Sequence, residues 1–168
     1  SSELVKAAVW AVISAIGAVL FYIWLRFEWQ FALGAVLALV HDIILTMGIF
    51  SQVQIKFDLA IIAALLTIVG YSLNDTVVVF DRIREFRLIN KSWEFNKTVN
   101  GALNSTLSRT LNTSFTTLVV LLAIFIFGGE SIQGFMFALI IGVMVGTYSS
   151  VFIATPVMFD TLRKSLKK

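Results

Sequence analysis

Five apolar stretches, each close to 20 residues long, constrain this chain more than any other feature of its sequence. They cover residues 4–25, 31–50, 57–80, 110–127 and 134–159. About 20 apolar residues in a helix cross the hydrocarbon core of a bilayer, and an open sheet cannot satisfy its backbone there. The stretches also lack the charged outer faces that helices around a soluble core would need. We therefore predict an all-α, polytopic bundle of five transmembrane helices.

Composition supports a membrane chain and removes several classes of site. Of the 168 residues, 58% are hydrophobic and 14% are charged, unlike ordinary soluble domains. The chain has no cysteine, which excludes disulfides and thiolate metal sites. It has no G-x-x-x-x-G-K-[ST] loop, and no cluster of metal ligands surrounds the single histidine. We therefore expect no enzyme activity, no cofactor and no metal.

The basic residues predict the orientation of the helices. The connections on one side carry ten of them, and the other side has only Lys6 and Lys56, with Arg109 left over. By the positive-inside rule the richer side is cytoplasmic, so the N-terminus lies outside and the C-terminus inside. Anionic lipid headgroups are sufficient partners for these charges, and no nucleic-acid platform is evident. The ten are Arg26, Arg82, Arg84, Arg87, Lys91, Lys97, Arg163, Lys164, Lys167 and Lys168.

The connection over residues 81–109 is the only sizeable polar segment, and we expect it to be cytoplasmic. Its second half, SWEFNKTVNGALNSTLSR, has an apolar residue every four positions from Phe95 to Leu107. This spacing predicts an amphipathic helix along the membrane interface. Ser92 would cap that helix, with Glu94 in its first turn. It could be a simple connector into the fourth span or a docking element for a partner.

Polar residues follow helical spacing inside the third and fourth spans. A polar side chain in a membrane is costly, so each needs a reason. We expect the two stripes to face each other in the bundle interior. The first stripe consists of Thr67, Gly70, Tyr71, Asn74 and Asp75, and the second of Arg109, Asn112, Thr113, Thr116 and Thr117.

Two further groups lie in the second and fifth spans. His41 and Asp42 sit halfway along the second span, with Thr46 one turn later. They form either a helix–helix hydrogen bond or a secondary ion site. In the fifth span, Gly142, Gly146 and Ser150 form a small-residue face of the type that allows close helix approach.

Asp75 is the strongest candidate for function. It lies about four residues inside the end of its apolar run, roughly 6 to 9 Å along the helix from the charged exit. Burial favours the protonated carboxyl, and a nearby guanidinium such as that of Arg109 favours the carboxylate. A group under these opposing influences can take up and release a proton, as in the proton relays of pumps.

Several strings resemble a known family. RFEWQFALGAVLALVHDIILTMGIF, FDLAIIAALLTIVGYSLNDTVVVFDRIRE, TLSRTLNTSFTTL, FGGESIQGF and IGVMVGTYSS closely resemble the membrane region of the SecF family. These bacterial protein-export subunits work with SecD and belong to the resistance-nodulation-division superfamily. The resemblance covers residues 4–162. It implies spans two to six of a six-span unit, with the first span and the extracytoplasmic domain absent.

The resemblance implies a proton-driven, in some relatives sodium-driven, accessory subunit of the Sec translocase in the bacterial cytoplasmic membrane. It would assist preprotein translocation and pack against SecD, with Gly142 and Gly146 at that contact. The family's coupling residues fall on Asp75 of GYSLND and Arg109 of LSRT. A structural scaffold without ion coupling stays open as an alternative. A drug exporter of the same superfamily is disfavoured, because this stretch carries a single acid where those exporters have a pair.

Overall fold

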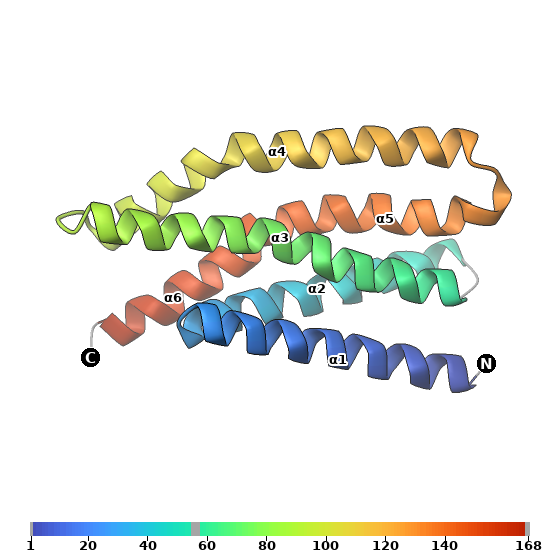
Figure 1. The fold of residues 1–168 in the computed structure, drawn as a ribbon, viewed down its shortest axis with the longest axis horizontal. Coiled ribbons are helices and arrows are strands. Elements are labelled where there is room, and N and C mark those ends of the chain that lie inside the picture. Colours follow the sequence, from blue (N-terminus) through green and yellow to red (C-terminus); the bar gives the residue numbers. More distant parts are fainter. Residues whose placement is uncertain (1, 55–57, 167–168) are drawn as a thin grey trace.

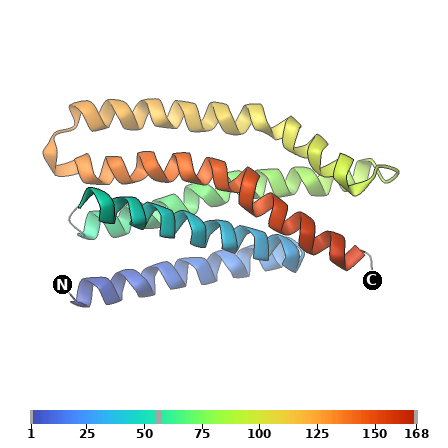
Figure 2. The same ribbon diagram turned by 180° about the vertical axis from the view of Figure 1, so that it is seen from behind.

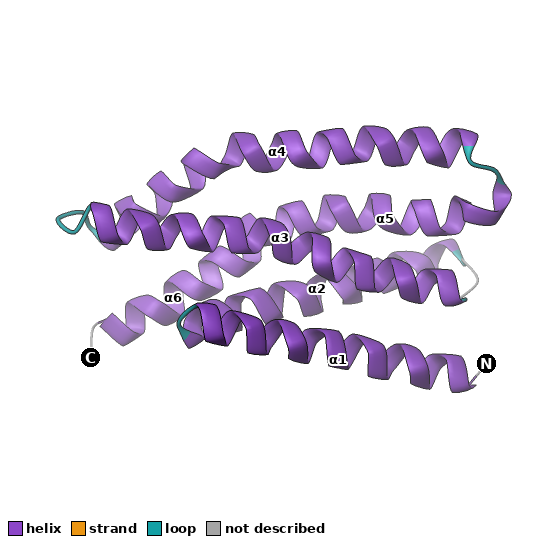
Figure 3. Cartoon of the chain, in the orientation of Figure 1, coloured by secondary structure: helices purple, strands orange, loops and turns teal. Residues whose placement is uncertain are grey.

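The computed structural model describes residues 2–54 and 58–166, and this part of the chain contains helices and no strand (Figure 3). In chain order the helices are α1 (Ser2–Arg26), α2 (Trp29–Val53), α3 (Leu59–Ile89), α4 (Phe95–Phe127), α5 (Glu130–Ser149), the π-helix η1 (Ser150–Ala154) and α6 (Thr155–Leu166).

Five segments are long and apolar enough to cross a membrane, which confirms the predicted all-α, multi-span bundle. They are Val5–Arg26, Trp29–Val53, Leu59–Ile89, Phe95–Phe127 and Glu130–Leu166. Phe57, where the third span was expected to begin, lies outside the described residues. The described helix starts at Leu59, after Asp58 has capped it by accepting a hydrogen bond from the Ile61 amide at 3.0 Å.

The two ends of the bundle carry different connections (Figure 1). The α1–α2 turn, the α3–α4 turn and the end of α6 lie at one end, while the start of α1, the end of α2, the start of α3 and the α4–α5 turn lie at the other. The three connections predicted to be rich in Arg and Lys therefore share one end of the molecule. This arrangement agrees with an odd number of spans.

The α3–α4 connection differs from its prediction. α3 continues as a helix to Ile89, and α4 runs without interruption from Phe95 to Phe127, so the expected amphipathic helix is the first part of α4. Glu94, which makes no side-chain cap, stands at the N-cap position predicted for Ser92. A change from charged to apolar composition does not end a helix unless proline or a capping motif interrupts it. The polar segment is therefore a helical hairpin (Figure 1).

The fifth span is also more complex than predicted. α5 passes through η1 into α6, and the helix changes direction there (Figure 2). Pro156, the only proline in the chain, is the second residue after η1. A proline ring clashes with the carbonyl four residues earlier, and a π-helical turn is a common way for a helix to absorb such a disturbance. The Thr155 hydroxyl bridges the wide turn by donating to the Ser150 carbonyl at 2.9 Å.

α3 and α5 form the centre of the bundle. Half of the residues in the apolar, membrane-crossing stretch of α3 are buried within this chain, against 17% for the corresponding stretch of α4 and 11% for that of α1. One apolar cluster, which includes Phe31, Phe80 and Met158, fills the end that carries the basic connections, and a second, which includes Ile61, Ile68 and Val143, fills the opposite end. Large faces of α1 and α4 are therefore left free for lipid or for another protein.

Candidate functional site

Asp75 lies on the inner side of α3, where 3% of its surface is exposed. Its Oδ2 atom is buried and has no hydrogen-bond partner. Most buried polar atoms in proteins are hydrogen-bonded, so an unpaired carboxylate oxygen needs an explanation. Within the residues that the structure describes, no ion pair joins Asp75 to Arg109 at 4.0 Å or less.

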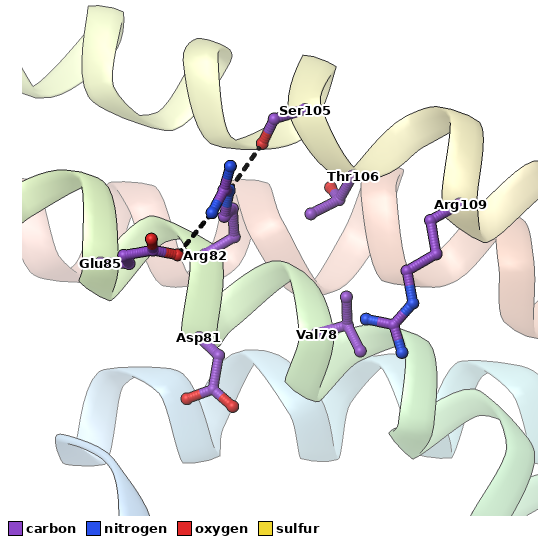
Figure 4. Close-up of a pocket in the computed structure, with 7 residues that line it drawn as sticks. All are labelled: Val78, Asp81, Arg82, Glu85, Ser105, Thr106 and Arg109. Atoms are coloured by element: carbon purple, nitrogen blue, oxygen red, sulfur yellow. Dashed lines mark hydrogen bonds and ion pairs between the residues drawn. The ribbon is translucent and has the colours of Figure 1, made fainter.

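Arg109 projects from α4 into a cavity of about 320 Å³ between α3 and α4 (Figure 4). Val78, one turn after Asp75 on α3, lines the same cavity. Arg82 closes another side by pairing with Glu85 at 2.6 Å and donating to the Ser105 hydroxyl at 3.0 Å. Asp81 and Thr106 complete the lining. The cavity thus brings the Arg109 guanidinium to the turn of α3 that follows Asp75.

The expectation that both polar stripes face the interior of the chain is wrong for most of their members. Asp75 is buried, and Tyr71, Thr113 and Thr117 are partly buried, but the other members are exposed on the surface. Their hydroxyls bond to carbonyls of their own helix, as Thr67 does to Ala63 at 2.8 Å and Thr116 to Asn112 at 2.9 Å, so they need no partner in another helix. The exposed members are Thr67, Gly70, Asn74, Arg109, Asn112 and Thr116.

Tyr71 begins a chain of hydroxyl contacts across three helices. Its phenol donates to the Ser114 hydroxyl on α4 at 3.4 Å, and Ser114 is 2.6 Å from the Thr147 hydroxyl on α5. Thr147 donates in turn to the Val143 carbonyl at 2.7 Å. These contacts connect α3, α4 and α5 one turn away from Asp75.

Asp42 is the most fully hydrogen-bonded acid inside the described bundle. Its Oδ2 atom accepts hydrogen bonds from the Ser72 hydroxyl on α3 at 2.6 Å and from the Ser149 hydroxyl on α5 at 2.7 Å. Its Oδ1 atom lies 3.1 Å from Nδ1 of the partly buried His41. Only 1% of Asp42 is exposed. The carboxylate therefore joins α2, α3 and α5.

Gly142 and Gly146 allow α5 to lie against α3. A Cβ atom at Gly142 would overlap the side chain of Ile68, and one at Gly146 would be 3.0 Å from the Ser72 Cβ. This face is therefore occupied by the chain's own α3 and is not free for SecD. Ser150, also fully buried, begins η1 and donates to the Thr147 carbonyl at 3.0 Å.

The sequence and the fold both match known proteins. The family described as "Protein export membrane protein SecD/SecF, C-terminal" matches residues 1–164. The protein translocase subunit SecF of Rhodobacter capsulatus is 55% identical over all of this chain and 51% of its own length. SecF of Rhodothermus marinus is 52% identical over 95% of this chain and 54% of its own length. This chain belongs to the SecD/SecF family.

Within the SecD/SecF family, the similarity is to the SecF membrane region. A crystal structure of SecDF in a super-membrane-facing form has a TM-score of 0.89 at 40% identity, covering 99% of this chain and 23% of that one. A second, of SecDF from Thermus thermophilus, has a TM-score of 0.87 at 41% identity, covering 94% and 22%. The chain is thus a multi-pass membrane region that spans about half the length of its SecF relatives.

Sequence reasoning found the acids of this SecF-like region but missed most of their partners. Ser72 and Ser149, which hold Asp42, had not been singled out, and neither had Ser114 and Thr147, which continue the contacts of Tyr71. Ser72 lies one turn before Asp75 on α3, and Ser149 lies one turn after Gly146 on α5. For Ser72 and Ser149, a hydroxyl residue one turn away from a buried acid or a packing glycine was the signal that could have found them; Ser114 and Thr147 carry no such signal.

Proposed function

We propose that this region is the ion-coupling membrane part of an accessory subunit of the Sec translocase. Asp75 takes up a proton from one side of the membrane and releases it to the other, and the proton-motive force thereby assists preprotein translocation. The observation that carries the proposal is the buried, unpartnered Oδ2 of Asp75. Ionisable groups within spans are costly and are retained mainly for ion pathways, proton relays and similar roles.

Arg109 is the second member of the coupling pair. It lines the cavity that begins one turn beyond Asp75, so a change of side-chain rotamer or a small helix movement is enough to alter their separation. When Asp75 is ionised, the guanidinium attracts it, and protonation removes that attraction. Two packings of α3 against α4 that differ in this contact form a two-state element that proton entry biases.

The exposed parts of the polar stripes are the contact surface for SecD. Asn74 on α3 and Asn112 on α4 are exposed within this chain, and an exposed amide in hydrocarbon is unfavourable. A second helical bundle laid over α3 and α4 would cover both. The similar solved structures are of SecDF, which supports such a partner. The basic end faces the cytoplasm and anionic lipids.

The test is ion-dependent export by the full-length protein assembled with SecD and the translocon. Asp75→Asn is expected to insert and assemble normally and to lose the part of export that depends on the ion gradient. Arg109→Met is expected to fail in the same way. Arg109→Lys retains part of the activity, since the charge remains without the planar guanidinium.

Asp58→Asn is the matched control. It makes the same chemical change at the other end of α3, where Asp58 accepts a hydrogen bond from the Ile61 amide, and asparagine caps a helix about as well as aspartate. Export by Asp58→Asn should equal that of the wild type. Full export by Asp75→Asn, with the gradient intact and after its collapse, would end the coupling proposal.

A structural scaffold is the second candidate, and the contacts of Tyr71 and Asp42 favour it for part of the site. Those groups join helices through hydroxyls and a carboxylate, which is the usual role of buried polar groups between membrane helices. If the whole site had this role, Asp75→Asn would lower the yield of the assembled complex before it lowered export per complex.

A further inference from the structure

The bundle buries two acids in opposite states of hydrogen bonding. Oδ2 of Asp42 accepts two serine hydroxyls, whereas Oδ2 of Asp75 accepts none. Both side chains are almost fully buried, at 1% and 3% exposure. Full satisfaction of a buried carboxylate stabilises one arrangement of its donors, and an unsatisfied one can respond to a change in its surroundings.

The two acids are connected through one turn of α3. Ser72, which donates to Asp42 at 2.6 Å, precedes Asp75 by three residues, so the two side chains project from adjacent turns of the same helix. The rotation of α3 that directs Ser72 toward α2 also sets the direction in which Asp75 projects. The hydrogen bond of Ser72 therefore fixes the direction in which the Asp75 side chain projects, although Asp75 takes no part in that bond.

α5 completes this arrangement. Ser149 donates to the same carboxylate oxygen at 2.7 Å, and Gly146 brings the α5 backbone against Ser72, where an added Cβ would lie 3.0 Å from the serine Cβ. Three helices thus meet at one oxygen atom. The nearest titratable group in the described contacts is His41, at 3.1 Å from the other oxygen.

We propose that Asp42 is a positioning residue for Asp75: by accepting the hydroxyls of Ser72 and Ser149, it holds α3 in the rotation that keeps the Asp75 carboxyl buried on the side of Arg109. The inference rests on the proposed function of Asp75 and assigns Asp42 no ion of its own. Loss of the charge or of either hydroxyl frees α3 to turn.

The experiment measures the chemical reactivity of Asp75 directly. An apolar carbodiimide modifies a protonated carboxyl in apolar surroundings, and mass spectrometry of the Asp75 peptide gives its rate across a pH series. The full-length protein in its complex with SecD is compared with Asp42→Asn, Ser72→Ala and Ser149→Ala. The rate at a given pH should change about threefold in each variant, the equivalent of the ~0.6 kcal/mol of an average interhelical hydrogen bond in a membrane.

Ser150→Ala is the matched control. Ser149 and Ser150 are both fully buried, and each also donates to a carbonyl of its own helix, but only Ser149 reaches Asp42. Ser150→Ala should leave the rate of Asp75 modification unchanged across the pH series. Thr76→Val serves the same purpose on α3, because the Thr76 hydroxyl donates only to the Ser72 carbonyl among the described contacts.

The outcomes separate this inference from the proposed function. Unchanged Asp75 reactivity in the Ser72 and Ser149 variants would overturn the positioning role, even if Asp75→Asn abolished export. An equal change in Ser150→Ala would overturn it as well, because general loosening of the bundle would then explain the result. Normal export by Asp75→Asn would refute the coupling function and leave the reactivity measurement intact. If Asp42→Asn does not assemble, the serine variants carry the test.

Discussion

Gly142→Ala tests how closely α3 and α5 are packed. The added Cβ would overlap the Ile68 side chain. Ile68 is 1% exposed and belongs to the apolar cluster around Ile61 and Val143, and its β-branched side chain has essentially one rotamer available in a helix. It cannot move aside, so the two helices must separate.

The expected cost is that of overpacking a closely packed core, about 1–3 kcal/mol in the free energy of unfolding. Gly48→Ala on α2 is the reference, because nothing lies within 4 Å of a Cβ placed there. Both substitutions replace glycine with alanine in a helix, and the higher helix propensity of alanine stabilises each variant equally, by about 1 kcal/mol or less. Their difference therefore isolates the steric cost at Gly142.

The assay is reversible unfolding of the purified protein in mixed detergent and dodecyl sulfate, followed by circular dichroism. The free energy of unfolding of Gly146→Ala should fall between those of Gly142→Ala and Gly48→Ala, since the nearest atom to the added Cβ is the Ser72 Cβ at 3.0 Å. Equal stabilities for Gly142→Ala and Gly48→Ala would refute the close contact of α3 with α5. The close approach of Gly146 to Ser72 would then lose its structural support as well.

Two further predictions concern topology and backbone strain. Single cysteines replacing Lys6 and Lys91, in a chain that has no cysteine of its own, should react with impermeant reagents only from the outer and the cytoplasmic side respectively; the reverse pattern would contradict the orientation inferred from the basic residues. Gly129→Ala should lower the free energy of unfolding by about 1–3 kcal/mol, because φ of +79° and ψ of 165° lie in a region that almost only glycine occupies. Gly17→Ala, which has open space for a Cβ, is its control, and equal stability of the two variants would contradict the strain.

The spans were predictable because bilayer thickness sets a length that an apolar run must match. The ends of the helices were less so. The composition becomes charged in residues 81–109, which marks where the helices leave the membrane. The backbone hydrogen bonds of a helix form in water as well as in lipid, so α3 continues past Arg82 and α4 already includes Leu103. A composition boundary was therefore mistaken for a helix boundary.

The acids of the site were predictable from the free-energy cost of a carboxylate inside a membrane span, whereas their hydrogen-bond partners were not. A carboxylate within a span is conspicuous, so both Asp75 and Asp42 were found. Ser72 and Ser149 are common membrane residues that usually bond to their own helix. Their places one turn from Asp75 and from Gly146 make them candidates, without showing that they reach another helix. Only the approach of α5 to α3 at Gly146 decides it.

The π-helical turn between α5 and α6 determines which side of α6 faces the bundle. An α-helix advances by about 100° per residue, so the extra residue in Ser150–Ala154 turns the rest of the segment by roughly that angle. Met158 and Leu162, at 0% and 1% exposure, point inward because of this offset. A relative one residue shorter here would form a regular helix that presents the same face, and an alignment should place its gap within the turn.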